Sequence, residues 1–156
     1  MKSVTRFLSS AGLVAAVLLL SGCAGLNSSQ QVSGKRSEVV SAALSQVGTP
    51  YRYGANAPGR ALDCSALTHY AYQQAGVPIP RMSVDQLRRA RPVPLEALRP
   101  GDLVFFHTGP GVHHVGLMVD KNRFVHASTS QHKVGLTRLY APYWTARYVG
   151  AGSYLD

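Results

Sequence analysis

The sequence is poor in cysteine and in acidic residues. Its 156 residues include two cysteines, and seven aspartates and glutamates stand against sixteen lysines and arginines, so the formal net charge is +9. Two cysteines are too few for a disulfide scaffold. Charged residues make up only 15% of the chain and hydrophobic residues 46%, which excludes a disordered polyelectrolyte. The length predicts one compact domain, and no internal repeat is visible.

No apolar stretch is long enough to span a bilayer, which takes about 20 residues of helix. The longest stretch runs from Ala11 to Leu20 and follows the basic residues Lys2 and Arg6. This arrangement fits the hydrophobic region of a secretory signal peptide, with a buried core helix as the alternative. We therefore expect residues 1–22 to be a signal peptide.

The apolar stretch ends in Leu20-Ser21-Gly22-Cys23, which resembles a bacterial lipobox. The resemblance implies that Cys23 becomes the first residue of the mature chain and carries acyl chains, palmitate among them, that hold it on a membrane. Because Ala24 follows the cysteine, it also implies the outer membrane, facing the periplasm, if the host is Gram-negative. A free or disulfide-bonded Cys23 is the alternative. Residues 23–35 are small, polar and aperiodic, and we expect a lipidated flexible tether.

Residues 36–156 predict helices followed by an antiparallel sheet. The expected helices cover Arg36–Gln46, Asp63–Gln74 and Ser83–Ala90. The expected strands cover Leu103–His107, His114–Val119, Arg123–Ser128 and about Ala146–Ala151. Helices first and strands afterwards indicate an α+β domain. In the third helix, Ser83 and Gln86 match a capping box.

Two histidines fall on one face of a predicted hairpin. If the hairpin loop is Asp120–Asn122, then Gly116 opposes His126, and His114 lies diagonal to His126 on the same face. Gly116 has no side chain and leaves room beside His126. A loop of two or four residues places the two histidines on opposite faces, so the geometry depends on the turn.

Cys64 lies in the first turn of the second predicted helix. Unpaired N–H groups and the helix dipole favour a thiolate at such a position. His114 can accept the thiol proton and later protonate a leaving amine, and His126 can orient His114. The alternative is a buried structural thiol with satisfied histidines. Six histidines also permit a metal site, but there is no His-Glu-x-x-His and no paired-cysteine spacing, so no metal or other cofactor is expected.

Six short motifs narrow these alternatives. They are Thr49-Pro50-Tyr51-Arg52-Tyr53-Gly54, Asp63-Cys64-Ser65-Ala66-Leu67, Pro80-Arg81, Pro100-Gly101-Asp102-Leu103-Val104-Phe105-Phe106, His114-Val115-Gly116-Leu117-Met118-Val119 and Phe124-Val125-His126-Ala127-Ser128. In this order they resemble the NlpC family of papain-like bacterial cell-wall cysteine peptidases, over about residues 38–152. Each motif alone is weak, whereas six in order are specific. The resemblance implies a papain-like α+β domain, with N-terminal helices packed on an antiparallel sheet and the catalytic cysteine at a helix N-terminus.

The same resemblance implies roles for individual residues. Cys64 corresponds to the nucleophile, His114 to the general base and His126 to the third residue that orients the base. Tyr51 matches a tyrosine whose hydroxyl helps the Cys64 backbone N–H to stabilise the oxyanion. The alternative for Tyr51 is a packing role in a glycine-rich loop.

Asp63 and Ser65 match positions that flank the nucleophile and line the substrate cleft. Asp63 is alternatively only the helix N-cap, and the two roles are compatible. The sequence departs from the family pattern at Ala55 and Ala66, where glycine is usual. Both changes are small, and we expect them to leave activity in place, although Ala55 alters the loop beside Tyr51.

The expected function is that of a lipid-anchored endopeptidase acting on peptide bonds in peptidoglycan stems or cross-links. Its partners are then the peptidoglycan substrate and, through the lipid, a membrane; no nucleic-acid partner is expected, and the chain is expected to be a monomer. Two alternatives stay open. One is a catalytically silent peptidoglycan-binding lipoprotein, and the other is an amidase or acyltransferase of the same fold acting on a different substrate.

Overall fold

A computed structural model describes residues 23–155, so the predicted signal peptide lies outside the described residues. The helices are α1 (Cys23–Leu44), α2 (Cys64–Gln74), α3 (Ser83–Arg89) and α4 (Pro142–Thr145), with a 3-10 turn η1 (Leu95–Ala97). The strands are β1 (Asn56–Ala57), β2 (Ala61–Leu62), β3 (Arg91–Pro92), β4 (Leu103–Gly109), β5 (Val112–Met118), β6 (Arg123–Ser128), β7 (Lys133–Arg138) and β8 (Tyr148–Ser153). The predicted α+β class is confirmed.

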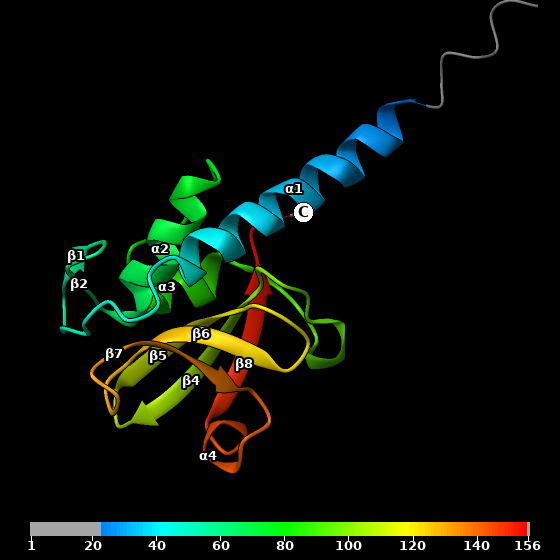
Figure 1. Ribbon diagram of the computed structural model, residues 1–156. Coiled ribbons are helices and arrows are strands. Elements are labelled where there is room, and N and C mark those ends of the chain that lie inside the picture. The colour runs from blue at the N-terminus through cyan, green and yellow to red at the C-terminus, as the bar shows by residue number, and fades with distance from the viewer. Residues whose placement is uncertain (1–22, 156) are drawn as a thin grey trace, which may run out of the picture.

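Within residues 23–155 the strands form one antiparallel sheet of six, in the order β3-β8-β4-β5-β6-β7, and a separate small hairpin of β1 and β2. Helices α1, α2 and α3 cover one face of the sheet, and α4 lies on the other (Figure 1). The helices lie on the sheet as the resemblance implied, with Cys64 the first residue of α2.

Side chains alternate between the two faces of the central strands, as in any pleated sheet. Phe105 and Val115 point to the helical layer and pack with Leu67 of α2, all buried. Phe106 and Phe124 point to the opposite face and form a second buried cluster, covered by α4 and the start of β8. The core is therefore split by the sheet into two apolar layers.

Helix α1 corrects the prediction for residues 23–35. This segment is helical and continuous with the predicted helix at Arg36, whereas the sequence predicted a flexible tether there. No proline interrupts residues 23–44, and a helix already formed extends at little cost once nucleated. Its domain end is held by Arg36, whose guanidinium donates to Asp102 Oδ1 at 2.8 Å and to Ser153 Oγ at 3.2 Å. Among residues 23–155 no helix combines the length and apolarity needed to cross a membrane.

Of the two predictions made for the starts of helices, the cap of α2 is confirmed and the capping box of α3 is wrong. Asp63 caps α2, because its carboxylate accepts the Ala66 N–H at 2.7 Å. The capping box at Ser83 is absent: Met82 is the N-cap of α3, and the Ser83 hydroxyl donates weakly to the His113 carbonyl. Gln86 is buried and bonds Thr68 and the Pro80 carbonyl instead of reaching back to the cap. Hydrogen bonds to residues distant in the sequence therefore replace the local capping box.

Candidate active site

The turn between β5 and β6 has the predicted length and gives the predicted register. Leu117 pairs with Val125 and Met118 with Phe124, the pairing that a three-residue loop requires. The consequence is that His114 and His126 share a face, with His114 Nε2 only 2.8 Å from His126 Nδ1. The hairpin geometry expected from the sequence is confirmed.

The hydrogen-bonded chain continues to a residue that the sequence reasoning missed. His126 Nε2 lies 3.0 Å from Thr137 Oγ1, on the neighbouring strand β7. If His114 Nε2 donates to His126 Nδ1, then His126 Nε2 donates to Thr137, and His114 Nδ1 is left without a proton. In that tautomer the free nitrogen of His114 is a base.

Aromatic rings enclose the two imidazoles. Trp144 of α4 stacks on His114 with ring centroids 5.5 Å apart and meets His126 edge-on at 5.0 Å. Phe124 lies against His126 at 5.0 Å. A Cβ built at Gly116 would come 2.3 Å from the Phe124 ring. The room beside Gly116, predicted to serve His126, is therefore filled by Phe124.

Burial sets the charge state of both histidines. It lowers the pKa of His114 to about 4, and burial together with the His114 charge lowers the pKa of His126 to about 3. Both imidazoles are neutral near pH 7. The side chains that face them from the neighbouring elements are rings and hydroxyls, Trp144, Phe106 and Thr137 among them.

Cys64 is a free, half-buried thiol at the start of α2. A backbone hydrogen bond from Val115 reaches it, so the thiol lies against the strand segment that carries His114. Burial raises the pKa of Cys64, and the Asp63 charge raises it further, while backbone N–H groups at the helix start lower it. Burial outweighs the helix terminus, so the pKa of the Cys64 thiol lies above its ordinary value, whereas its position at the helix start alone favours a lower one.

Arg81 links the residues that flank the nucleophile. Its guanidinium forms a fork with the Asp63 carboxylate, at 2.8 and 3.0 Å, and donates to Ser65 Oγ at 2.8 Å. It also donates to the Ala55 carbonyl at 3.2 Å. Sequence reasoning gave Arg81 no role, although it stands in the Pro80-Arg81 motif. Asp63 thus acts as helix cap and ion-pair partner together.

Tyr51 enters the site from the loop that precedes β1. Its backbone N–H donates to the His132 carbonyl at 2.9 Å, which fixes the start of this loop on the β6–β7 connection. Burial raises the pKa of the Tyr51 phenol, and the charges of Cys64 and Asp63 raise it further. The phenol is therefore near both groups. The structure brings Tyr51, Asp63, Cys64 and Ser65 to one end of α2.

A cavity of about 330 Å³ opens beside the two histidines. Its lining is rich in hydroxyl and amide groups from β4 and from the hairpin of β6 and β7: Thr108, Ser128, Thr129, Ser130, Gln131 and Thr137. Among residues 23–155 no group of three or more His, Cys, Asp and Glu side chains is arranged to hold a metal ion.

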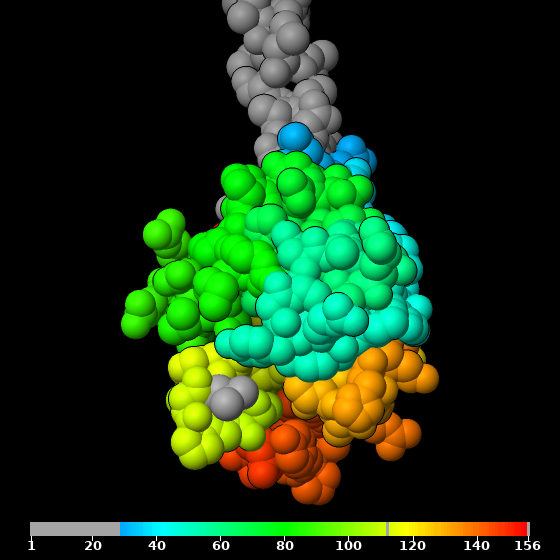
Figure 2. All heavy atoms as spheres, turned by 90° about the vertical axis from the view of Figure 1, so that its left-hand side faces the viewer, coloured from blue at the N-terminus to red at the C-terminus, as the bar shows by residue number. Residues whose placement is uncertain are grey.

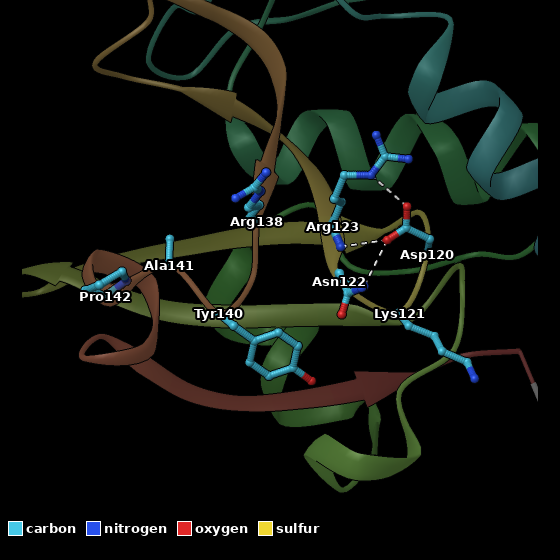
Figure 3. Close-up of a pocket in the computed structure, with 8 residues that line it drawn as sticks. All are labelled: Asp120, Lys121, Asn122, Arg123, Arg138, Tyr140, Ala141 and Pro142. Carbon is cyan, nitrogen blue, oxygen red and sulfur yellow. Dashed lines mark hydrogen bonds and ion pairs between the residues drawn. The ribbon is translucent and has the colours of Figure 1, made fainter.

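A larger hollow, of about 830 Å³, lies at the β5–β6 turn (Figure 3). Arg123 at the start of β6 and Arg138 at the end of β7 line it, and Arg123 Nε forms an ion pair with Asp120 Oδ2 at 2.7 Å. None of the predicted site residues lines it. It is separate from the histidine pair.

Comparison with known proteins identifies a family for this chain. Residues 48–153 match the model of the NlpC/P60 family. The chain is 39% identical over 113 residues to the murein DD-endopeptidase MepH of Escherichia coli, covering 69% of this chain and 42% of that protein. It is 35% identical over 115 residues to the gamma-DL-glutamyl hydrolase of Bacillus subtilis, covering 72% of this chain and 28% of that protein. The chain therefore spans less than half of either relative.

A solved structure shows the same fold. The peptidoglycan hydrolase RipB of Mycobacterium tuberculosis superposes with a TM-score of 0.69 at 27% identity, covering 83% of this chain and 71% of that one.

Proposed function

The chain belongs to the NlpC/P60 family, and from that premise we propose that it is a cysteine endopeptidase that hydrolyses peptide bonds in peptidoglycan. Its relatives include proteins named murein DD-endopeptidase and peptidoglycan hydrolase. The observation that carries the proposal is the 2.8 Å contact between His114 Nε2 and His126 Nδ1, in which His114 belongs to β5, the strand that Cys64 lies against. A binding protein without catalysis has no need of this arrangement.

The proposed reaction starts from a neutral thiol and a neutral imidazole. The Cys64 sulfur attacks the scissile carbonyl carbon, and its proton passes to His114 Nδ1 in the same step. His126 accepts the His114 Nε2–H and so holds the ring in place while it becomes positively charged. Transferring the proton during attack suits a site in which burial disfavours both separated charges.

The remaining steps use the same groups. The carbonyl electron pair moves onto oxygen, which accepts hydrogen bonds from the Cys64 backbone N–H and the Tyr51 hydroxyl. When that pair returns, the C–N bond breaks, and His114 gives its proton to the leaving amine. Water then attacks the thioester, releasing the carboxylic acid and restoring the Cys64 thiol. The fork from Arg81 holds Asp63, and through it the helix start, in position.

If the host is Gram-negative, the proposed site of action is the periplasmic face of an outer membrane. It rests on the lipobox-like sequence ending in Cys23. Wild-type protein from its native host should partition into detergent with a lipid on Cys23, and Cys23→Ala should not be processed at that position. Mass spectrometry that finds an unmodified Cys23 in the mature protein contradicts the anchor.

A second candidate is hydrolysis of a gamma-glutamyl bond outside peptidoglycan. It is favoured by the 35% identity to a gamma-DL-glutamyl hydrolase. The two candidates share Cys64 and His114 and differ only in the polymer that enters the cleft. Equal digestion of purified poly-gamma-glutamate and sacculi would favour this second reading.

The deciding experiment incubates the full chain with purified sacculi and with isolated muropeptides and identifies the products by mass. We expect alkylation of Cys64 to abolish hydrolysis and a chelator to leave it unchanged. His114→Ala should lose as much activity as Cys64→Ala, His126→Gln should keep a measurable fraction, and His126→Ala should fall between. Chelator sensitivity without alkylation sensitivity contradicts the cysteine mechanism. Full activity of His126→Ala reduces the site to a Cys–His dyad.

A further inference from the structure

The loop between Tyr51 and β2 is rigid in its backbone. Its tip is tied down by the Gly59 N–H, which donates to Gln46 Oε1 at 2.7 Å. Its middle is tied down twice, because the Ala55 carbonyl accepts both the Asp63 N–H at 3.2 Å and the Arg81 guanidinium. In the space-filling view this loop stands above the ends of the β4–β5 and β6–β7 hairpins (Figure 2). A surface loop held at this many points is pre-organised.

The side chains of this rigid loop point to solvent. Tyr53 is 88% exposed, the highest fraction among the large exposed hydrophobic side chains of the described residues. Arg52 and Arg60 are also exposed, and the three side chains line one shallow hollow of about 640 Å³. Within residues 23–155 neither Arg52 nor Arg60 has a carboxylate within ion-pair distance, whereas Arg81 is committed to Asp63.

Arg52, Tyr53 and Arg60, which we call the arginine–tyrosine platform, have the composition of a binding surface. Tyrosine and arginine are the side chains most enriched at the centres of interfaces, where a rigid aromatic supplies area and a guanidinium grips carboxylates in a fork. Two unpaired arginines select an anionic partner. The hollow is open and shallow, so it suits a segment of a polymer more than an enclosed small molecule.

We propose that the arginine–tyrosine platform binds carboxylate groups of a peptide strand in peptidoglycan, outside the bond being cleaved. The polymer's identity rests on the proposed function. The same loop carries Tyr51 into the site, and Arg52 of the platform directly follows Tyr51, whose hydroxyl lies near Cys64. A polymer held on the platform therefore presents its next segment to the cleft.

An anionic membrane is a weaker fit for this surface. Each arginine near a bilayer contributes only about 1 kcal/mol, so two of them do not hold a domain there. The loop that carries the platform also stands above the ends of the β4–β5 and β6–β7 hairpins (Figure 2), and it leads through Tyr51 into the site, so a substrate strand bound in the site passes close to it. We therefore assign it to the substrate.

The test measures binding, separately from cleavage. Full-length Cys64→Ala protein is co-sedimented with purified sacculi, and R52A/Y53A/R60A is introduced into the same background. We expect the dissociation constant to rise about tenfold or more, which is the loss of at least one central contact. The salt dependence of binding should become shallower, because two charges leave the interface. R52Q and R60Q singly replace the triple variant if it fails to fold by circular dichroism.

The matched control is R88A/R89A, which removes two exposed arginines from α3 and changes the net charge equally. Its dissociation constant should stay within about twofold of the parent, because only long-range attraction is lost. Equal weakening in control and platform variants overturns the proposal, as does unchanged binding of the platform variants. Loss of binding to vesicles containing phosphatidylglycerol, with sacculus binding intact, assigns the surface to a membrane and also overturns it. Wild-type hydrolysis is measured in parallel, so a chain that binds sacculi through the platform without cutting them fails the proposed function alone.

Discussion

The two sides of the candidate site are built differently. Around Cys64 the neighbours are charged and tightly hydrogen-bonded, with Asp63, Ser65 and Arg81 joined within 2.8 to 3.2 Å. Around His114 the neighbours are uncharged, and Trp144 covers the ring. Polar contacts therefore fix the position of the nucleophile, whereas apolar burial fixes the proton affinity of the base.

This difference determines which changes disturb the nucleophile and which disturb the base. The charged network is partly exposed, and it keeps its geometry only while both partners of the ion pair are present. Removing one partner leaves the other charge partly buried and unpaired, which costs free energy. Burial stabilises the neutral form of the imidazole pair, so protonation of these rings at low pH costs folding free energy. A third region, the Arg36–Asp102 pair at the start of β4, has the charged character of the first without any contact to the site.

The largest effect is expected at this third region. Arg36→Ala leaves the fully buried Asp102 carboxylate without its ion-pair partner and should destabilise the fold by about 3–5 kcal/mol. Urea denaturation at neutral pH measures the loss. Protein that remains folded should still cleave substrate, because Arg36 lies outside the site. A loss below about 1 kcal/mol contradicts the assignment of Arg36 as the anchor of α1.

Low pH should destabilise the fold through the neutral histidine pair, His114 and His126. The folded-state pKa values of His114 and His126, about 4 and about 3, lie below the ordinary 6.5, so the unfolded chain binds more protons between these limits. Stability from this pair is complete above pH 6.5 and falls as the pH drops, by up to about 1.4 kcal/mol per histidine per pH unit. Denaturation midpoints from pH 7 to pH 4.5 measure it.

The comparison for this experiment is His126→Gln, which removes one of the two titrating groups. Its stability should decline less steeply with falling pH than that of the wild type. Parallel slopes for the two proteins mean that groups other than His126 cause the acid sensitivity.

A substitution at Arg81 tests the charged network beside Cys64. Arg81→Ala frees the Asp63 carboxylate beside the nucleophile, and we expect kcat/KM to fall about 100-fold, or about 2.7 kcal/mol. Stability should fall by only about 1–2 kcal/mol, because the pair is partly exposed and Asp63 still caps α2. Arg81→Lys should recover little activity, since an ammonium cannot form the fork. A stability loss as large as that of Arg36→Ala would mean that the two arginines are both structural.

Sequence reasoning worked where the signal was local. The Asp63 cap, the start of α2 and the β5–β6 register each follow from a few adjacent residues, and the structure has all three. It failed for the extension of α1, because residues 23–35 have no apolar stripe to reveal a helix. Strand β7 was missed because Gly135 interrupts an already weak alternation. The last strand begins later than predicted, since α4 takes up the preceding residues.

Contacts between distant segments were out of reach. The Arg81 fork joins residues 18 positions apart, and the His126–Thr137 contact depends on the unpredicted strand β7. The thiol pKa of Cys64 was misjudged for a related reason: a helix terminus can be identified in a sequence, whereas the burial that outweighs it arises from packing against β5. The resemblance named candidate site residues, but it could not supply their charge states.

The smallest effect is expected at Thr137, which contributes a single hydrogen bond to the neutral histidine pair. Thr137→Val keeps the shape and removes the hydroxyl that His126 Nε2 meets at 3.0 Å, so His126 loses its preference for the tautomer that accepts from His114. We expect kcat to fall about threefold to tenfold with KM unchanged, a loss near 1 kcal/mol. Thr137→Ser should restore the wild-type rate and pH profile, because it restores the acceptor. A role in packing alone predicts the opposite ranking, with valine tolerated and serine, which lacks the methyl group, impaired.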